Sequence, residues 1–203
     1  MTAPYVAFAL DDVLANLREP LMCALNRRTG LDWHWHDWTE YKLCERYRAT
    51  VEDVQRWLVD DAVLEQALPE PHAVECVAAA RDAGYRVAVV TARAWHPRGE
   101  ALTRDWLRTH GLRVDALHLV PIFTEKASTL RALGTVRHYV DDHAGHLHPA
   151  RGIVHRLHLL DRPWNRSDSA LPRIHALPEL SAALQADPAQ GSRPRSAPRP
   201  AAS

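Results

Sequence analysis

Four groups of polar residues in this chain follow predicted strands or begin the next helix, and all are of types that can handle a phosphate. They are Asp11 with Asp12, Thr91 to Arg93, Lys126, and Asp141 with Asp142. Carboxylates are the hard oxygen ligands that Mg²⁺ requires, while hydroxyl and ammonium groups can neutralise the charge that develops during phosphoryl transfer. A lone Asp pair after a strand is more often a turn or a helix cap, so the prediction of a site depends on the four groups occurring together.

The segments between these groups predict the framework that would bring them together. Apolar runs predict strands at residues 4–10, 87–90, 117–120, 138–140 and 153–160. Helical patterns that end at a Gly predict helices at 71–83, 98–110 and 125–133, and a short helix is expected at 178–186. Strands and helices that alternate in this way form a parallel, Rossmann-like α/β sheet with helices on both faces. Because ligands of such sheets bind beyond the carboxyl ends of the strands, we expect the polar groups at one edge.

Residues 16–68 have a different character and predict a helical insertion without any strand. Leucines recur there at helical spacing, and Gly30 is expected to end the first helix. Thr50-Val51-Glu52-Asp53 has the Ser/Thr-x-x-acid form of a helix start. We therefore expect a helical cap that is inserted after the first strand.

These patterns divide the chain into three parts. Residues 1–15 and 69–186 are expected to form the α/β core, and residues 16–68 the cap. Residues 187–203 carry no large apolar side chain and cannot bury a core, so this tail is predicted to be disordered.

The composition excludes several classes of partner. The 203 residues hold 25 Lys and Arg against 25 Asp and Glu, so no net charge attracts a nucleic acid polymer or a membrane surface. Cys23, Cys44 and Cys76 are too few and too widely spaced for a disulfide framework, which favours a reducing compartment. No apolar run is long enough to span a bilayer, and the N-terminus lacks the pattern of a signal peptide. A cytoplasmic protein is expected.

The chain resembles the haloacid dehalogenase-like phosphatases. Residues 5–14, Tyr-Val-Ala-Phe-Ala-Leu-Asp-Asp-Val-Leu, are similar to the first motif of that superfamily, a hydrophobic strand followed by Asp-x-Asp. The order of an acid pair, Thr, Lys and a second acid pair is also that of the superfamily. Its first Asp is the nucleophile that takes the phosphoryl group, and in this chain Ala9 stands at that position. With Asp11 as the nucleophile instead, the acid would be Val13, which carries no proton.

The resemblance implies a role for each polar group. Asp11 would act as general acid and then as general base. Thr91, Ala92, Arg93 and Lys126 would bind the phosphate, and Asp11, Asp141 and Asp142 would hold Mg²⁺, Asp11 through a nearby backbone carbonyl. The substrate would be a small phosphate ester.

A narrower resemblance is to the 5'(3')-deoxyribonucleotidase group. It rests on Asp-Asp-Val-Leu-Ala, Val-Val-Thr-Ala-Arg and Val-Asp-Asp, and on a Pro-aromatic-Asn-Arg sequence within residues 160–166. It implies a nucleoside monophosphate as substrate and aromatic cap residues around the base. Trp33, Trp35, Trp38 and Trp57 are the candidates, although tryptophans of a small cap are about as often its own core.

Ala9 leaves the activity open. Removal of a covalent nucleophile costs on the order of 10⁴–10⁶ in rate. The chain is then a greatly slowed phosphatase, a phospho-ligand or nucleotide-binding pseudoenzyme, an engineered trapping variant, a protein with different chemistry on the same scaffold, or an interaction protein that uses its Trp-rich cap. A homodimer also stays open, and histidines offer a structural zinc site as a weaker alternative. Those histidines are His34, His36, His143, His146 and His148.

Overall fold

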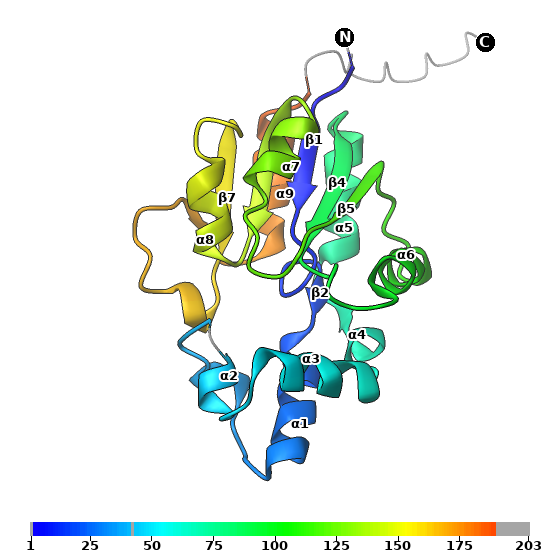
Figure 1. The fold of residues 1–203 in the computed structure, drawn as a ribbon. Coiled ribbons are helices and arrows are strands. Elements are labelled where there is room, and N and C mark those ends of the chain that lie inside the picture. The colour runs from blue at the N-terminus through cyan, green and yellow to red at the C-terminus, as the bar shows by residue number, and fades with distance from the viewer. Residues whose placement is uncertain (1, 42, 190–203) are drawn as a thin grey trace, which may run out of the picture.

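The computed structural model describes residues 2–41 and 43–189, in which a parallel sheet stands between two layers of helices (Figure 1). The strands lie in the order β5-β4-β1-β6-β7-β8, and every neighbouring pair is parallel. They are β1 (Tyr5–Phe8), β4 (Arg86–Thr91), β5 (Ala116–Leu119), β6 (Val136–Asp141), β7 (Arg156–Leu160) and β8 (Arg173–Ile174). This sheet confirms the predicted fold class. The sequence does not predict β8, because two residues are too few to show a period.

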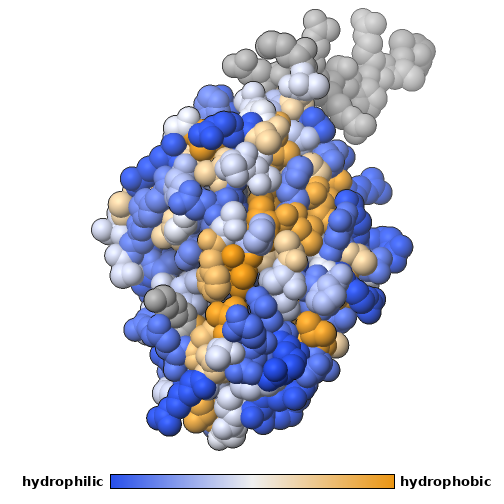
Figure 2. All heavy atoms as spheres, viewed as in Figure 1, coloured by the Kyte–Doolittle hydropathy of each residue, from blue (hydrophilic) through white to orange (hydrophobic). Residues whose placement is uncertain are grey.

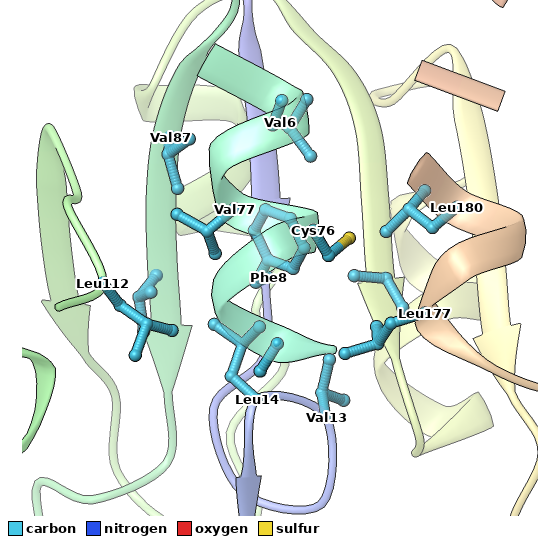
Figure 3. Packing of buried hydrophobic residues seen from close by; sticks show 14 of the residues in the cluster. Val6, Phe8, Val13, Leu14, Cys76, Val77, Val87, Leu112, Leu177 and Leu180 are labelled. Atoms are coloured by element: carbon cyan, nitrogen blue, oxygen red, sulfur yellow. The ribbon is translucent and has the colours of Figure 1, made fainter. Parts of the chain in front are cut away.

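Helices cover both faces of the sheet. One face carries α5 (Ala73–Asp82), α6 (Gly99–Thr109) and α9 (Leu177–Ala186), and the other carries α7 (Ala127–Ala132) and α8 (Ala144–Leu147). Side chains of β1 alternate between the layers: Val6 and Phe8 pack with α5 and α9 (Figure 3), whereas Tyr5 and Ala7 pack with α7 and α8. Because both faces are buried, the strands appear in the sequence as continuous apolar runs.

The cap is built from short helices between β1 and β4, at one end of the sheet (Figure 1). They are α1 (Arg18–Thr29), a 3₁₀ turn (Trp35–Asp37), α2 (Leu43–Arg46), α3 (Val51–Asp60) and α4 (Val63–Gln66). As predicted, Gly30 ends α1 in the left-handed region at φ 69°. Thr50 begins α3 as predicted, and its hydroxyl accepts a hydrogen bond from the backbone N–H of Asp53 at 3.0 Å.

The prediction that residues 16–68 contain no strand is wrong at both ends of the segment. β2 (Ala15–Asn16) pairs antiparallel with β3 (Leu68–Pro69). The chain therefore leaves the core and returns to it through two paired segments. Strands of two residues give no periodic signal, which is why the sequence does not reveal them.

The predicted tail begins too early. Asp187 forms ion pairs with Arg137 at 3.0 Å and with Arg156 at 3.0 Å. Ala189 is buried, and its N–H donates to the carbonyl of Ala83 at 2.9 Å. Residues 187–189 thus belong to the core, and residues 190–203 lie outside the described part of the chain.

Two further findings concern the predicted class of protein. Cys23, Cys44 and Cys76 are free thiols. Within the described residues, every helix is too short or too polar to span a bilayer.

Candidate functional site

The candidate site lies at the carboxyl-terminal edge of the sheet, where β1 ends between β4 and β6. Ala9 follows β1 and is buried, and its N–H donates to the carbonyl of Val140 at 2.9 Å. The parallel register of β1 with its two neighbours puts Ala9 beside the ends of those strands, which carry Thr91 and Asp141. The position predicted for a nucleophile is therefore central to the edge and carries a methyl group.

Backbone N–H groups near Ala9 lack partners among the described residues. Leu10 and Asp11 follow β1, and Ala92 follows β4, and the N–H of each makes no hydrogen bond within the described part of the chain. Leu10 is fully buried, and an unpaired buried amide is rare in folded proteins. Backbone donors at such a place can bind an anionic oxygen.

Asp11 is held by Arg93. Nε of Arg93 lies 3.1 Å from Oδ1 and 3.0 Å from Oδ2 of Asp11, and Nη2 also donates to Oδ1. Thr91 Oγ1 lies 3.5 Å from Asp11 Oδ2. The side chain of Arg93 is only 1% exposed, so its guanidinium is committed to this carboxylate and to Thr103. Arg93 was predicted to bind phosphate, and its charge is already matched by Asp11.

Lys126 forms a second buried pair. Its Nζ donates to Oδ2 of Asp141 at 2.8 Å, and the hydroxyl of Tyr139 donates to the same oxygen. Burial alone would raise the pKa of Asp141, but the neighbouring ammonium of Lys126 prevails and lowers this pKa to about 2. Asp141 is thus ionised, and it holds Lys126 at the carboxyl edge of the sheet, where β6 ends.

Asp142 has no ion pair with a described residue. The indole N–H of Trp164 donates to its Oδ2 at 2.9 Å, and the side-chain amide of Asn165 donates to its backbone carbonyl at 2.8 Å. Burial, together with the charges of Asp141 and Asp12, raises the pKa of Asp142 well above its usual range.

The predicted magnesium ligands do not form a metal centre as they are placed. Within residues 2–41 and 43–189, no three His, Cys, Asp or Glu side chains gather in a way that could hold a metal ion. The physical reason is that Ala9 supplies no oxygen, Arg93 engages both carboxylate oxygens of Asp11, and Lys126 engages Asp141. These residues do not fit Mg²⁺, and we derive no chemical step through it.

The histidines considered for zinc have other contacts. His34 and His36 share a hydrogen bond of 2.7 Å between ring nitrogens in the cap. His143 and His146 pack edge to face, and His148 lies 2.5 Å from Asp168.

A buried ion network joins the core to the cap at the β2–β3 pair. Arg18 in the first turn of α1 donates to Oδ1 of Asp12 from its backbone N–H (3.0 Å) and from Nη1 (3.2 Å), and Nη1 also pairs with Glu70. Arg162 lies 3.2 Å from Glu70 Oε1 and donates to the carbonyl of Asp12 at 2.7 Å. Burial raises the pKa of Asp12 to about 6, although the charge of Arg18 opposes this. Sequence analysis missed Arg18 and Glu70.

A cavity of about 430 Å³ lies between the cap and the sheet edge, and Asp11, Asp12 and Asp142 contribute to its lining. Two aromatic contacts hold the cap against the core beside it. Trp38 packs on Trp164 with ring centroids 4.2 Å apart, and Tyr41 stacks on His143 at 3.8 Å. The carboxylates therefore face a pocket at the junction of the cap and the core.

Of the four cap tryptophans, only Trp38 lines this cavity. Trp33 is exposed beneath the guanidinium of Arg46, Trp35 stacks on His36, and Trp57 packs against the apolar cluster between the cap and Trp164. Sequence analysis missed the other aromatic lining residues, which are Tyr41, Trp95 and Phe123. Two of them could have been identified from their position in the sequence, because Trp95 and Phe123 lie in the loops that directly follow β4 and β5.

Comparison with known proteins gives matches of structure. No protein-family model and no curated protein matches the sequence. A putative phosphoglycolate phosphatase from Lactobacillus delbrueckii subsp. bulgaricus is 16% identical with a TM-score of 0.66, over 91% of this chain and 99% of that one. CbbY from Rhodobacter sphaeroides, solved in complex with phosphate, is 19% identical with a TM-score of 0.59, over 88% and 96%. L-2-haloacid dehalogenase from Xanthobacter autotrophicus, with chloropropionic acid covalently bound, is 12% identical with a TM-score of 0.59, over 91% and 99%.

These identities are low, so the likeness concerns the fold, and the likeness extends over nearly the whole chain, cap included. The chain has the fold of the haloacid dehalogenase-like hydrolases.

Proposed function

We propose that this chain binds a small phosphate ester at the carboxyl edge of its sheet and hydrolyses it slowly or not at all. The observation that carries the proposal is the local environment of Ala9. A buried methyl group lies at the end of the central strand, beside unpaired backbone N–H groups of Leu10 and Asp11 and beside the hydroxyl of Thr91. The anion site is retained while the attacking group is absent.

The described residues account for the binding. The unpaired N–H groups and the Thr91 hydroxyl are donors for phosphate oxygens. Lys126 uses one of its ammonium donors for Asp141, which leaves others for the ligand. Arg93 keeps the carboxylate of Asp11 in a fixed orientation, where it can take a proton from the attacking water and then pass that proton to the leaving oxygen.

Turnover is a separate matter. With Ala9 in place no carboxylate can form a covalent phospho-enzyme, and hydrolysis must use water directly. By analogy with the loss of other nucleophiles, the rate is expected to fall on the order of 10⁴–10⁶-fold. The phosphatases among the structural neighbours support a phosphate ester as ligand. A nucleoside monophosphate, a cytoplasmic location and a homodimer stay predictions from the sequence.

The first prediction is that Ala9→Asp restores phosphatase activity. Release of phosphate from a panel of phosphate monoesters should rise at least about 10³-fold above the unmodified chain, because an attacking carboxylate returns to an otherwise intact site.

Two variants serve as controls. Ala9→Asn has the same shape as the Asp variant without its nucleophilic oxygen and should stay inactive. Ala9→Asp combined with Asp11→Asn should lose most of the recovered rate. An Ala9→Asp protein that folds, binds no inorganic phosphate and hydrolyses no ester would contradict the proposed function.

A further inference from the structure

The cavity between the cap and the candidate site is lined mostly by apolar side chains. Its volume is about 430 Å³, within the range of small-molecule sites. Leu21, Val54 and Leu58 line it from the cap, and Trp95, Ile122 and Phe123 line it from the core loops. Figure 2 shows hydrophobic surface that continues down one face of the core to the junction with the cap.

The polar groups of the cavity are few, and the charged ones are acidic. Besides Asp11, Asp12 and Asp142, the described lining has Glu45 and the amide of Gln55, and it includes no Lys, Arg, His, Ser, Thr or Asn. Its other polar atoms are the Tyr41 hydroxyl, the Cys44 thiol and the indole N–H groups of Trp38 and Trp95. Ribose hydroxyls and base amines could donate to these carboxylates, but the carbonyl and ring-nitrogen acceptors of a base would meet few donors in this lining and would lose their water at a cost. Buried polar groups without partners weaken binding. The lining therefore favours a ligand with little polarity beyond its phosphate.

Phe123 marks the entrance of the cavity. Its side chain is 70% exposed although it contributes to the lining, and its backbone φ is +63°. A bulky residue in the left-handed region is strained, and such strain concentrates at binding sites. Phe123 is followed by Thr124, which is exposed and takes no part in the lining.

The aromatic residues indicate the shape of the ligand. Trp38, Tyr41, Trp95 and Phe123 supply ring surfaces from both the cap and the core. Rings pack well against other rings through offset or edge-to-face contacts.

We propose that the cavity binds the leaving group of an aryl phosphate, a phosphate monoester whose alcohol is a flat, apolar aromatic ring system. This inference rests on the proposed function, because the phosphate would occupy the edge near Ala9. Phe123 is the specificity-determining residue at the entrance.

Calorimetric titration of the unmodified chain tests the inference with 1-naphthyl phosphate, inorganic phosphate, 1-naphthol and deoxyuridine monophosphate as probes. We expect 1-naphthyl phosphate to bind at least about tenfold more tightly than each of the others. Phe123→Ala should weaken the binding of 1-naphthyl phosphate about fivefold or more and leave the affinity for inorganic phosphate unchanged. Thr124→Ala is the matched control and should change neither affinity.

The outcomes separate the two proposals. Deoxyuridine monophosphate bound as tightly as 1-naphthyl phosphate, or a Phe123→Ala variant with unchanged affinities, overturns the aryl ligand while the phosphate site stands. Binding of 1-naphthol equal to that of 1-naphthyl phosphate, without binding of inorganic phosphate, overturns the proposed function and the aryl phosphate with it.

Discussion

Single side chains decide whether the site at the sheet edge can act. Ala9 removes an oxygen from the centre of the edge, while Arg93 and Lys126 each neutralise one of the remaining carboxylates. A bidentate guanidinium on Asp11 and a buried ammonium on Asp141 are strong, charge-assisted contacts. These two ion pairs offset the repulsion between the neighbouring carboxylates and fix the position of each.

The position of Arg93 depends on a glycine at the start of α6. A Cβ on Gly99 would lie 2.2 Å from the backbone carbonyl oxygen of Arg93, which is a steric clash. The backbone of Arg93, and with it the guanidinium that holds Asp11, is therefore packed against a position in α6 that has no side chain.

We predict that Gly99→Ala lowers the free energy of unfolding by about 1–3 kcal/mol, because the backbone at Arg93 must shift to admit the methyl group. Urea unfolding measures the change. Glu100→Ala, at an exposed neighbouring position of the same helical turn, is the control and should stay within about 0.5 kcal/mol. A Gly99→Ala protein as stable as the parent would show that this close approach is not needed.

At the scale of elements, the cap is attached to the core by a short antiparallel pair and a buried ion network. β2 and β3 carry the chain out and back, and Arg18, Asp12, Glu70 and Arg162 surround that crossing. A buried charge that loses its partner is costly, so the network fixes the direction in which α1 leaves the core.

We predict that Glu70→Gln lowers the free energy of unfolding by about 2–4 kcal/mol, because two buried guanidinium groups would then share too little negative charge. Glu75→Gln, on the exposed side of α5, removes the same charge from the same region and should have almost no effect. Chemical denaturation of both variants provides the comparison, and equal stability would mean that the network does not hold the cap.

At the scale of the whole molecule, buried histidines couple stability to pH. His138 and His158 lie on the neighbouring strands β6 and β7, with ring nitrogens 3.0 Å apart. Burial lowers the pKa of each to about 4. A lowered pKa means that the unfolded chain takes up protons first, so this contribution to stability is present above pH 6.5 and is lost as the pH falls towards 4.

We predict that His158→Gln removes one such contribution. Between pH 7 and pH 4.5, the free energy of unfolding of the parent should fall by about 2 kcal/mol more than that of the variant. Urea unfolding at the two pH values measures this difference. His155→Gln, at an exposed position just before β7, is the control and should change the free energy of unfolding equally at both pH values. A His158→Gln protein with the parent's pH dependence would show that His158 does not couple stability to pH.

Much of the architecture could be predicted because its signals are local. The apolar run that ends at Phe8, the left-handed Gly30 and the helix start at Thr50 are each written in a few adjacent residues. The strands β2, β3 and β8 could not be predicted, because two residues carry no periodicity. For the same local reason the four polar groups could be assigned to strand ends.

The sequence by itself determined the parallel fold, the inserted cap and the absence of a carboxylate at residue 9, since these follow from the order and types of neighbouring residues. Only the tertiary structure decided which charges meet: Arg93 reaches Asp11 across 82 residues of chain, and Glu70 reaches Arg18 across 52. It also decided that Trp38, and not Trp33, Trp35 or Trp57, faces the cavity. Such contacts depend on how whole elements pack, and no local pattern in a sequence contains that information.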